Sequence, residues 1–363
     1  MKIITILGTR PELIRLSLLI KELDKYAEHF IVHTGQNYDY ELDKIFFEEL
    51  KIREPNFFLK AKGTFSEQLS IIFPKLEKII LDIKPDKFLV LGDTNSSMGA
   101  IVAKRLGIPV FHLEAGNRCH DQIVPEEVNR KIIDHSSSIL MPYTENSKKN
   151  LLLEGLENKN IYVVGNPINE VINKHITKIN TSRILKQLKL KINEFALITL
   201  HREENVDDKD VIAEITKAIG FLAKKHKKLK FVWPIHPRTT KRLTDYKIKS
   251  LNEKNIHLIK PLGFIDFCNL EKNAKIILTD SGTVQEECAI FKKNCLIIRN
   301  TTERPEVIES GAAILTGTKR NNIISNFDCT LNEKPKITTP IEYQYQNFTR
   351  IVSNILLGNN LGK

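Results

Sequence analysis

Residues 88–116 read FLVLGDTNSSMGAIVAKRLGIPVFHLEAG, and the alternation within this stretch decides the fold class. The short apolar runs Phe88–Leu91 and Val110–Leu113 predict two buried strands. Between them, Ser97–Leu106 has the apolar spacing of an amphipathic helix. A strand, a helix and a strand in this order indicate a parallel sheet that carries helices on both faces.

The same alternation runs through the rest of the chain. In the first half we also expect strands at Ile3–Leu7, Phe30–His33, Ile139–Met141 and Ile161–Val164, and helices at Pro11–Leu23, Ser66–Leu81 and Asn146–Leu153. The pattern then restarts, with strands expected at Ala196–Leu200, Phe231–Pro234, Ile256–Ile259, Ile276–Thr279, Cys295–Ile298 and Ala313–Leu315. Helices fit Val211–Lys225, Asp266–Lys272, Val284–Phe291 and Pro305–Glu309. The two series predict two doubly wound α/β halves of similar size.

The polar stretch Asn173–Ser182 lacks a clear strand pattern, so we place the domain boundary there. We expect an N-terminal Rossmann-like domain over residues 1–172 and a C-terminal Rossmann-like domain over residues 173–342. Tyr343–Leu357 has a helical pattern with no strand after it, and we expect residues 343–363 to pack back on the first domain. The length of 363 residues also suits two domains of roughly 150 residues each.

Composition excludes several classes of protein. The net charge is +11, but the lysines are scattered along the chain, which argues against nucleic-acid binding and fits a small anionic substrate equally well. The five cysteines form no C-x-x-C pair, which argues against a disulfide framework or a zinc site. No window reaches about 18 apolar residues, and the N-terminal apolar run is too short for a signal peptide. We therefore expect a cytoplasmic protein without a membrane partner.

Polar motifs directly follow the predicted strands in both halves. They are GTRPE (8–12), TGQN (34–37), GDTNSS (92–97), HLEAG (112–116), HREEN (201–205), PIHPRT (234–239), TDSGT (279–283) and RNTTERPE (299–306). Ligands of open α/β sheets bind at the carboxyl ends of the strands. Random surface charge would not favour these ends in both halves, so we expect two Rossmann-like domains that face each other across a ligand cleft.

Several of these motifs suit an anion. Ser281 and Gly282 stand at a strand-to-helix junction, where free backbone N–H groups can bind a phosphate, although plain helix capping would explain them too. Arg10 and Arg304 each precede a proline that starts a helix, and such a pair on opposing domains suits a diphosphate. Glu287, further along its helix, can either reach a ribose hydroxyl pair or lie on a solvated face.

Other motifs suit acid–base chemistry. Asp93 and Glu114 follow adjacent predicted strands, and helix capping is the alternative for Asp93. Pro125 can start a helix on which Glu126 shares a face with Arg130, and Glu127 is spaced likewise from Lys131. Two surface ion pairs are the alternative to a site on this helix. His201 and His236 also follow strands; a lone histidine is more often structural, but two at strand ends in one half favour a site.

Together these motifs resemble the non-hydrolysing UDP-N-acetylglucosamine 2-epimerase family, from GTRPE at position 8 to TTERPE ending at 306. The resemblance implies two Rossmann-like domains of the GT-B type with a UDP-sugar substrate between them, and a homodimer as the assembly. It implies that UDP-GlcNAc and UDP-ManNAc interconvert by elimination of UDP to a 2-acetamidoglucal and re-addition. No metal or nicotinamide cofactor is required.

The resemblance also implies roles for individual residues. The acids, bases and sugar contacts would be Asp93, Glu114, Glu126 and His201. The substrate-binding residues would be Arg10, Arg15, Gln36, Arg130, His236, Phe267, Ser281, Gly282, Glu287 and Arg304. Phe267 falls where the family stacks an aromatic ring on uracil, whereas the sequence by itself suggests a core residue.

The sequence departs from the family pattern at four places. Arg15 replaces a lysine, TDSGT replaces TDSGG, and HREEN replaces the HRREN that accompanies an allosteric site in part of the family. The segment EAGNRCHDQIVPEE (114–127) is two residues shorter than usual and resembles the branch that makes UDP-N-acetyl-L-fucosamine from its talose epimer, a 6-deoxy sugar. A GT-B glycosyltransferase and a non-catalytic nucleotide-sugar sensor are the remaining alternatives.

Overall fold

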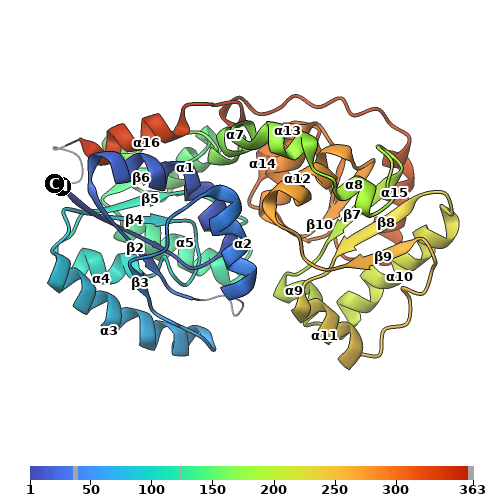
Figure 1. Ribbon diagram of the computed structural model, residues 1–363, viewed down its shortest axis with the longest axis horizontal. Coiled ribbons are helices and arrows are strands. Elements are labelled where there is room, and N and C mark those ends of the chain that lie inside the picture. Colours follow the sequence, from blue (N-terminus) through green and yellow to red (C-terminus); the bar gives the residue numbers. More distant parts are fainter. Residues whose placement is uncertain (36–39, 123, 359–363) are drawn as a thin grey trace. The chain divides into compact units, whose positions relative to one another are not determined.

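The computed structural model describes residues 1–35, 40–122 and 124–358, and the chain forms two compact units. Unit 1 comprises Met1–Asn173 and Glu342–Lys363, and unit 2 comprises Lys174–Ile341 (Figure 1). No helix in these described ranges is long and apolar enough to cross a lipid bilayer.

Unit 1 is built on a parallel sheet in the order β3-β2-β1-β4-β5-β6. Its strands are β1 (Lys2–Leu7), β2 (Glu28–His33), β3 (Phe57–Phe58), β4 (Lys87–Leu91), β5 (Val110–Leu113) and β6 (Ile139–Met141). Its helices are α1 (Arg10–Tyr26), α2 (Tyr40–Leu50), α3 (Phe65–Ile83), α4 (Gly99–Arg105), α5 (Pro125–Ser136), α6 (Glu145–Leu153) and α16 (Phe348–Leu357). Helix α7 (Pro167–Thr181) starts in unit 1 and continues into unit 2.

Unit 2 is built on a second parallel sheet in the order β12-β11-β10-β7-β8-β9. Its strands are β7 (Phe195–Thr199), β8 (Lys230–Pro234), β9 (Ile256–Ile259), β10 (Ile276–Thr279), β11 (Cys295–Ile297) and β12 (Ala313–Leu315). Its helices are α8 (Ile184–Gln187), α9 (Glu203–Val206), α10 (Lys209–Lys225), α11 (Pro237–Asp245), α12 (Phe264–Asn273), α13 (Gly282–Phe291), α14 (Pro305–Glu309) and α15 (Arg320–Leu331). Counted along the chain, both sheets have the 3-2-1-4-5-6 order of a dinucleotide-binding fold. The expected α/β class is therefore confirmed.

The central strands are apolar along their whole length because helices cover both faces of each sheet. In unit 1, Ile4, Ile6 and Val90 of the central strands pack with Leu76 and Ile80 of α3 and are fully or almost fully buried. In unit 2, strand residues such as Ile198 and Leu278 pack in the same way with helix residues such as Ile219 of α10. These cores hold the strand ends rigid, and the polar motifs begin at those ends.

The C-terminal helix α16 belongs to unit 1, although its sequence follows the whole of unit 2. It packs against α1, and the buried ammonium of Lys87 donates hydrogen bonds to the carbonyls of Leu356 (2.7 Å) and Gly358 (2.5 Å). A lysine at a helix C-terminus satisfies carbonyls that have no partner inside the helix. Lys87 thereby ties the end of α16 to the start of β4.

Some details differ from the sequence expectations. Ile161–Val164 is not a strand: Ile161 forms only an isolated bridge with Leu140 of β6. The amides of Tyr162 and Val164 do bond to the Leu140 and Pro142 carbonyls, but Pro142 has no N–H with which to continue the ladder. The polar stretch that begins at Asn173 has no strand, as expected, and α7 continues through it as far as Thr181. The two-residue strand β3 was missed because it is too short to show a period.

The start of α1 shows how a strand-end motif is fixed. Thr9 and Glu12 form a capping box, and Pro11 occupies the first turn. One oxygen of the buried Glu12 carboxyl accepts from the amides of Gly8 (3.0 Å) and Thr9 (2.8 Å), and the other accepts from the Thr94 hydroxyl (3.0 Å). Burial raises the pKa of Glu12 to about 7, although these hydrogen bonds lower it. Glu12 thus joins the loops after β1 and β4.

We expect Glu12→Gln to remove the part of the pH dependence of the unfolding free energy that comes from the Glu12 carboxyl group. The raised pKa means that the folded state keeps a proton which the unfolded chain loses, so unfolding free energy falls as the pH rises from 4.5 to about 7. The whole effect is about 3 kcal/mol at 1.36 kcal/mol per pH unit. Denaturant unfolding of wild type and Glu12→Gln over this range checks it, and equal pH slopes for the two proteins would contradict it.

Candidate active site

The candidate acids Asp93 and Glu114 come from neighbouring strand ends in unit 1. Leu91 of β4 lies opposite Leu113 of β5 in the parallel register, so the two acids follow at the same edge of the sheet. Glu114 has a φ of +66°, a left-handed conformation that costs a residue with a side chain about 1–2 kcal/mol. Gly92 lies beside it, since a Cβ on Gly92 would be 3.5 Å from Glu114 Oε2. A strained backbone at an acidic side chain is typical of a functional position.

Glu114 is held by a buried arginine. Arg15 Nη1 of α1 pairs with Glu114 Oε2, and both side chains are less than a tenth exposed. The other oxygen, Oε1, accepts from the Asn117 amide at 3.1 Å. Arg15 also lies over the ring of Tyr143, with 5.7 Å from Cζ to the ring centroid. The carboxylate therefore has one fixed orientation at the end of β5.

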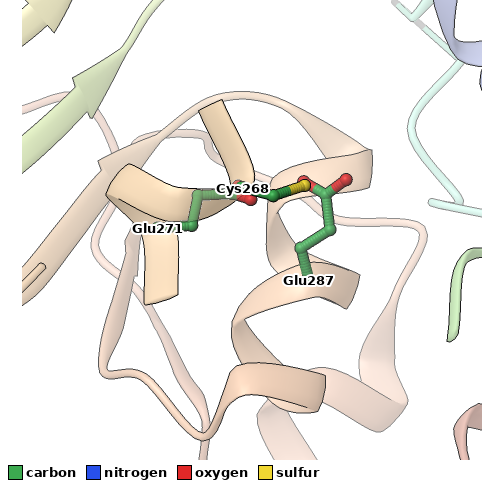
Figure 2. A group of neighbouring side chains, drawn as sticks. All are labelled: Cys268, Glu271 and Glu287. Carbon is green, nitrogen blue, oxygen red and sulfur yellow. The ribbon is translucent and has the colours of Figure 1, made fainter. Parts of the chain in front are cut away.

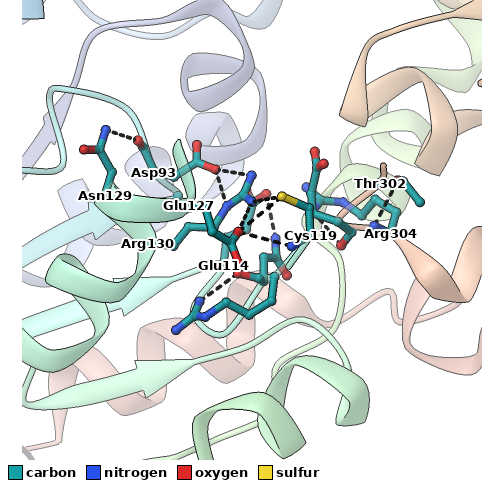
Figure 3. A network of polar contacts seen from close by, with 12 residues as sticks. Asp93, Glu114, Cys119, Glu127, Asn129, Arg130, Thr302 and Arg304 are labelled. Atoms are coloured by element: carbon teal, nitrogen blue, oxygen red, sulfur yellow. Dashed lines mark hydrogen bonds and ion pairs between the residues drawn. The ribbon is translucent and has the colours of Figure 1, made fainter. Parts of the chain in front are cut away.

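Asp93 is held by a second arginine, Arg130, from α5 (Figure 3). Arg130 Nε and Nη2 both lie 2.7 Å from Asp93 Oδ2, and the Asn129 amide donates to the backbone carbonyl of Asp93 at 2.9 Å. Asp93 stays about a quarter exposed, whereas Arg130 is buried. The pairing leaves part of the carboxylate accessible while it fixes the side chain.

The alternative of a surface ion pair between Glu127 and Lys131 is wrong. The structure buries Glu127 and pairs it with Arg130 at 2.8 Å (Figure 3). Its oxygens also accept from the backbone amides of Cys119 (3.1 Å) and His120 (3.2 Å). Burial raises the pKa of Glu127, but the Cys119 amide and Arg130 outweigh burial and hold that pKa below its usual range. Glu127 thus clamps the segment between β5 and α5.

A further buried network supports the same loop and was missed from the sequence. Asp134 of α5 accepts from His112 Nδ1 and Arg118 Nη2, each at 2.8 Å, and His112 Nε2 faces the Gly92 carbonyl at 2.9 Å. Burial raises the pKa of Asp134, but His112 and Arg118 together hold it below its usual range. Glu127, Arg130 and Asp134 are spaced i, i+3 and i+7, so the inward face of α5 was the available signal.

In unit 2, the buried Asp280 organises the loop after β7. Its carboxylate accepts from the backbone amides of His201 (3.0 Å) and Arg202 (2.9 Å) and from the Asn205 amide (3.2 Å). His201 Nδ1 lies 3.4 Å from the same carboxylate, while the His201 side chain is about half exposed. This arrangement presents an imidazole at the end of β7 on a fixed backbone.

The Ser281–Gly282 junction opens α13 directly after β10. Ser281 is the N-cap residue, and its backbone amide donates to the Thr279 hydroxyl at 3.0 Å. A Cβ on Gly282 would come within 2.7 Å of Glu303 Oε1, so a larger residue does not fit without a shift. The start of a helix directly after a strand is a position at which backbone N–H groups can bind an anion, so the anion-binding role of Ser281 and Gly282 stays a prediction.

Arg304 is buried and forms an ion pair, which its motif did not predict. Its Nε donates to Glu286 Oε1 of α13, and both side chains are buried. The next carboxylate, Glu303, accepts from Arg299 Nη1 at 2.8 Å and from Arg202 Nη2 at 3.4 Å. Buried arginine–carboxylate pairs therefore fix the loop after β11, just as they fix the loops of unit 1.

The structure also places the other predicted residues except Gln36. Arg10 opens α1, half-buried, with its Cζ 5.9 Å from the Phe46 ring centroid. Glu126 lies half-buried in the first turn of α5, and His236 is the N-cap residue of α11. Phe267 lies half-buried in α12 and Glu287 is buried in α13, whereas Gln36 lies outside the described residues. In unit 1 the structure brings together Arg15, Asp93, Glu114 and Arg130.

We expect Glu127→Ala to destabilise the protein by about 3 kcal/mol, because it leaves a buried arginine short of a partner and two loop amides without an acceptor. Lys131→Ala, which removes the exposed partner first expected for Glu127, should change the stability by less than about 0.5 kcal/mol. Denaturant unfolding of the two variants checks this. Equal losses of unfolding free energy would contradict the role of Glu127 in holding the segment between β5 and α5.

Comparison with known proteins identifies the family of the chain. A family model described as UDP-N-acetylglucosamine 2-epimerase matches residues 21–354. The chain is 42% identical to the UDP-N-acetylglucosamine 2-epimerase of Methanocaldococcus jannaschii, over 94% of this chain and 95% of that protein. It is 34% identical to the UDP-2,3-diacetamido-2,3-dideoxy-D-glucuronate 2-epimerase of Pseudomonas aeruginosa, over 92% and 93% of the two chains.

The similarity extends to three dimensions. A crystal structure of the M. jannaschii enzyme in complex with UDP-GlcNAc and UDP matches with a TM-score of 0.93 at 41% identity, covering 99% of this chain and 100% of that one. Sequence and structure agree over nearly the full length of both proteins. The chain therefore belongs to the UDP-N-acetylglucosamine 2-epimerase family and is an isomerase.

Proposed function

We propose that the protein interconverts UDP-GlcNAc and UDP-ManNAc by inverting C2 of the sugar. The observation that carries this proposal is the pair of carboxylates at adjacent strand ends, Asp93 and Glu114, each fixed by its own arginine in a member of this family. Inversion requires a proton to leave one face of C2 and another to reach the opposite face. Two separately oriented acids can serve both faces, whereas one acid cannot easily do so.

The chemistry explains why the site also needs a strong anion-binding half. When the C1–O bond breaks, its electron pair leaves with UDP and C1 becomes oxocarbenium-like. The C2 proton then becomes acidic, a carboxylate removes it, and the C2–H electron pair forms the C1=C2 double bond of 2-acetamidoglucal. Re-addition of UDP at C1, with a proton delivered to the other face of C2, gives the epimer. Stabilising the departing diphosphate lowers the barrier in both directions.

In unit 1, Asp93, Glu114 and Glu126 are the candidate acids and bases of these steps. Arg130 and Glu127 position Asp93 and the loop, while Arg15 positions Glu114. The partly exposed Asp93 carboxylate can exchange its proton with solvent, as repeated turnover requires. Arg10, at the start of α1, suits the diphosphate.

In unit 2, the candidate nucleotide contacts surround the start of α13. Ser281 and Gly282 suit the phosphates because helix N–H groups and the helix dipole stabilise anions. His201 suits a phosphate or sugar oxygen, and Glu287 suits the ribose hydroxyls. Phe267, half-buried on α12, suits stacking on uracil. None of these roles requires a metal or a nicotinamide.

Two observations bear on the identity of the sugar. The 42% identical relative is named for UDP-GlcNAc, whereas the 34% identical relative is named for a different UDP-sugar. The higher identity to the relative named for UDP-GlcNAc favours UDP-GlcNAc as the substrate. The shortened segment 114–127 favours the alternative 6-deoxy substrate, UDP-2-acetamido-2,6-dideoxy-L-talose, and its described part is fixed by Asn117, Arg118 and Glu127.

We further propose that the protein is a homodimer, which the family resemblance supports, and that it is cytoplasmic, which the cysteine pattern supports. Light scattering after size-exclusion chromatography tests the assembly directly. A monomer at micromolar concentration would contradict the dimer.

We expect the wild-type protein to exchange the C2 hydrogen of UDP-GlcNAc for deuterium in D₂O and to form UDP-ManNAc, as followed by proton NMR. Glu114→Gln should lower the rate at least about a hundredfold, because the amide neither accepts nor returns a proton. Binding of UDP by this variant, measured by calorimetry, should change little. The exposed Glu77→Gln is the matched control, and an active Glu114→Gln enzyme would contradict the assigned role.

A substrate series tests the choice of sugar. We expect kcat/KM for UDP-GlcNAc to exceed that for the 6-deoxy-L-talo sugar by more than about tenfold. The reverse order would move the assignment to the alternative substrate. Sugar transfer to an acceptor without any epimer would instead indicate a glycosyltransferase.

A further inference from the structure

A buried cluster of two acids and a thiol in unit 2 includes Glu287, one of the predicted nucleotide contacts. Cys268 and Glu271 extend from α12 toward Glu287 of α13 (Figure 2), and one ligand atom of each lies within 4.8 Å of the others. Glu271 is fully buried, and neither of its carboxyl oxygens has a hydrogen-bond donor with normal geometry. A carboxyl group in such a place calls for an explanation, because an unpaired buried carboxylate is strongly unfavourable.

The charges around Glu271 indicate its protonation state. Among the described residues, no lysine, arginine or histidine forms an ion pair with it. The titratable groups that face the cluster from α12, α13 and β11 are Glu287, Cys268, Cys288 and Cys295, with Lys293 near Cys288. Burial, and next the negative charge of Glu287, raise the pKa of Glu271 well above its usual range. Two adjacent buried carboxylates disfavour each other's ionisation, so the pair keeps one proton at a pH below the raised pKa of Glu271.

A neutral Glu271 has an O–H group that needs an acceptor, and a carboxylate oxygen of Glu287 lies within 4.8 Å of a carboxyl oxygen of Glu271. We propose that Glu271 donates its carboxyl proton in a hydrogen bond to Glu287 and so orients Glu287 for the ribose hydroxyls of the UDP-sugar. Glu271 is then a positioning residue that acts through Glu287 and does not contact the substrate. This inference rests on the proposed function, which assigns the ribose contact to Glu287.

The hydrogen bond has a clear effect on recognition. It restricts the rotation of the Glu287 carboxylate and so fixes the direction in which that carboxylate can accept from the ribose. It also lets Glu287 keep its negative charge beside a neutral neighbour. When the pH rises through the raised pKa of Glu271, the pair becomes doubly charged, the hydrogen bond is lost, and the preference for a 2′-hydroxyl should fall.

Calorimetric binding of UDP and 2′-deoxy-UDP to the full-length protein tests the inference. The dissociation constant of 2′-deoxy-UDP divided by that of UDP measures the preference for the 2′-hydroxyl and so isolates the ribose contact. At pH 7, Glu271→Gln should have the same ratio as the wild type, since its amide N–H also donates to Glu287. At alkaline pH the ratio of Glu271→Gln should stay at this value, whereas that of the wild type should fall. Glu271→Leu should weaken UDP binding about tenfold and lower the ratio by a similar factor. Lys272→Ala on the same helix is the control and should keep the wild-type ratio.

Three outcomes would overturn the inference. The first is an unchanged ratio in Glu271→Leu, and the second is an equal loss of both ligands together with a lower melting temperature, which indicates a merely structural role. The third is stoichiometric zinc in the purified protein, because Cys268, Glu271 and Glu287 would then be metal ligands. Failure of the proposed function is visible separately, as a wild-type protein that binds UDP but forms no epimer, or that does not bind UDP.

Discussion

The charge of a buried arginine must be neutralised inside the protein, and much of unit 1 depends on how Arg130 meets this constraint. Its guanidinium pairs with Asp93 from the end of β4 and with Glu127 from its own helix. Glu127 in turn binds the backbone at Cys119 and His120. One side chain thus fixes the helix, the strand end and the loop between them, and the position of the candidate acid Asp93 follows from that.

The same solution recurs at the other loops. Arg15 neutralises Glu114 at the end of β5, and Arg304 neutralises Glu286 beside α13 in unit 2. These pairs cost desolvation energy and so are weak contributors to net stability. What they provide is orientation: each carboxylate or loop has one favourable position. Reactions that move a proton across two faces of one carbon need this kind of preorganisation.

Much of the fold and the positions of the candidate residues follow from the sequence, because both depend on local patterns. Short apolar runs bounded by polar motifs identify the central strands, and the carboxyl-end rule places Asp93 and Glu114 together. The differences have physical causes. Ile161–Val164 has a strand composition, yet the missing N–H of Pro142 prevents a ladder.

The sequence did not predict which side chains pair with each other in the folded protein. Glu127 and Lys131 have ideal spacing for a surface pair, but the choice between Lys131 and Arg130 depends on which face of α5 is buried. The partners of Glu286 and Asp134 come from distant segments, and no local pattern predicts them. The proton shared between Glu271 and Glu287 likewise depends on the packing of α12 against α13.

The central claim is that a buried arginine acts by positioning an acid. A double-mutant cycle of kcat for Asp93→Asn, Arg130→Met and the combined variant tests it most directly. If Arg130 acts through Asp93, the combined variant should be no more than about threefold slower than Asp93→Asn alone. Losses that multiply in the combined variant would contradict the account, because Arg130 would then act by a route other than Asp93.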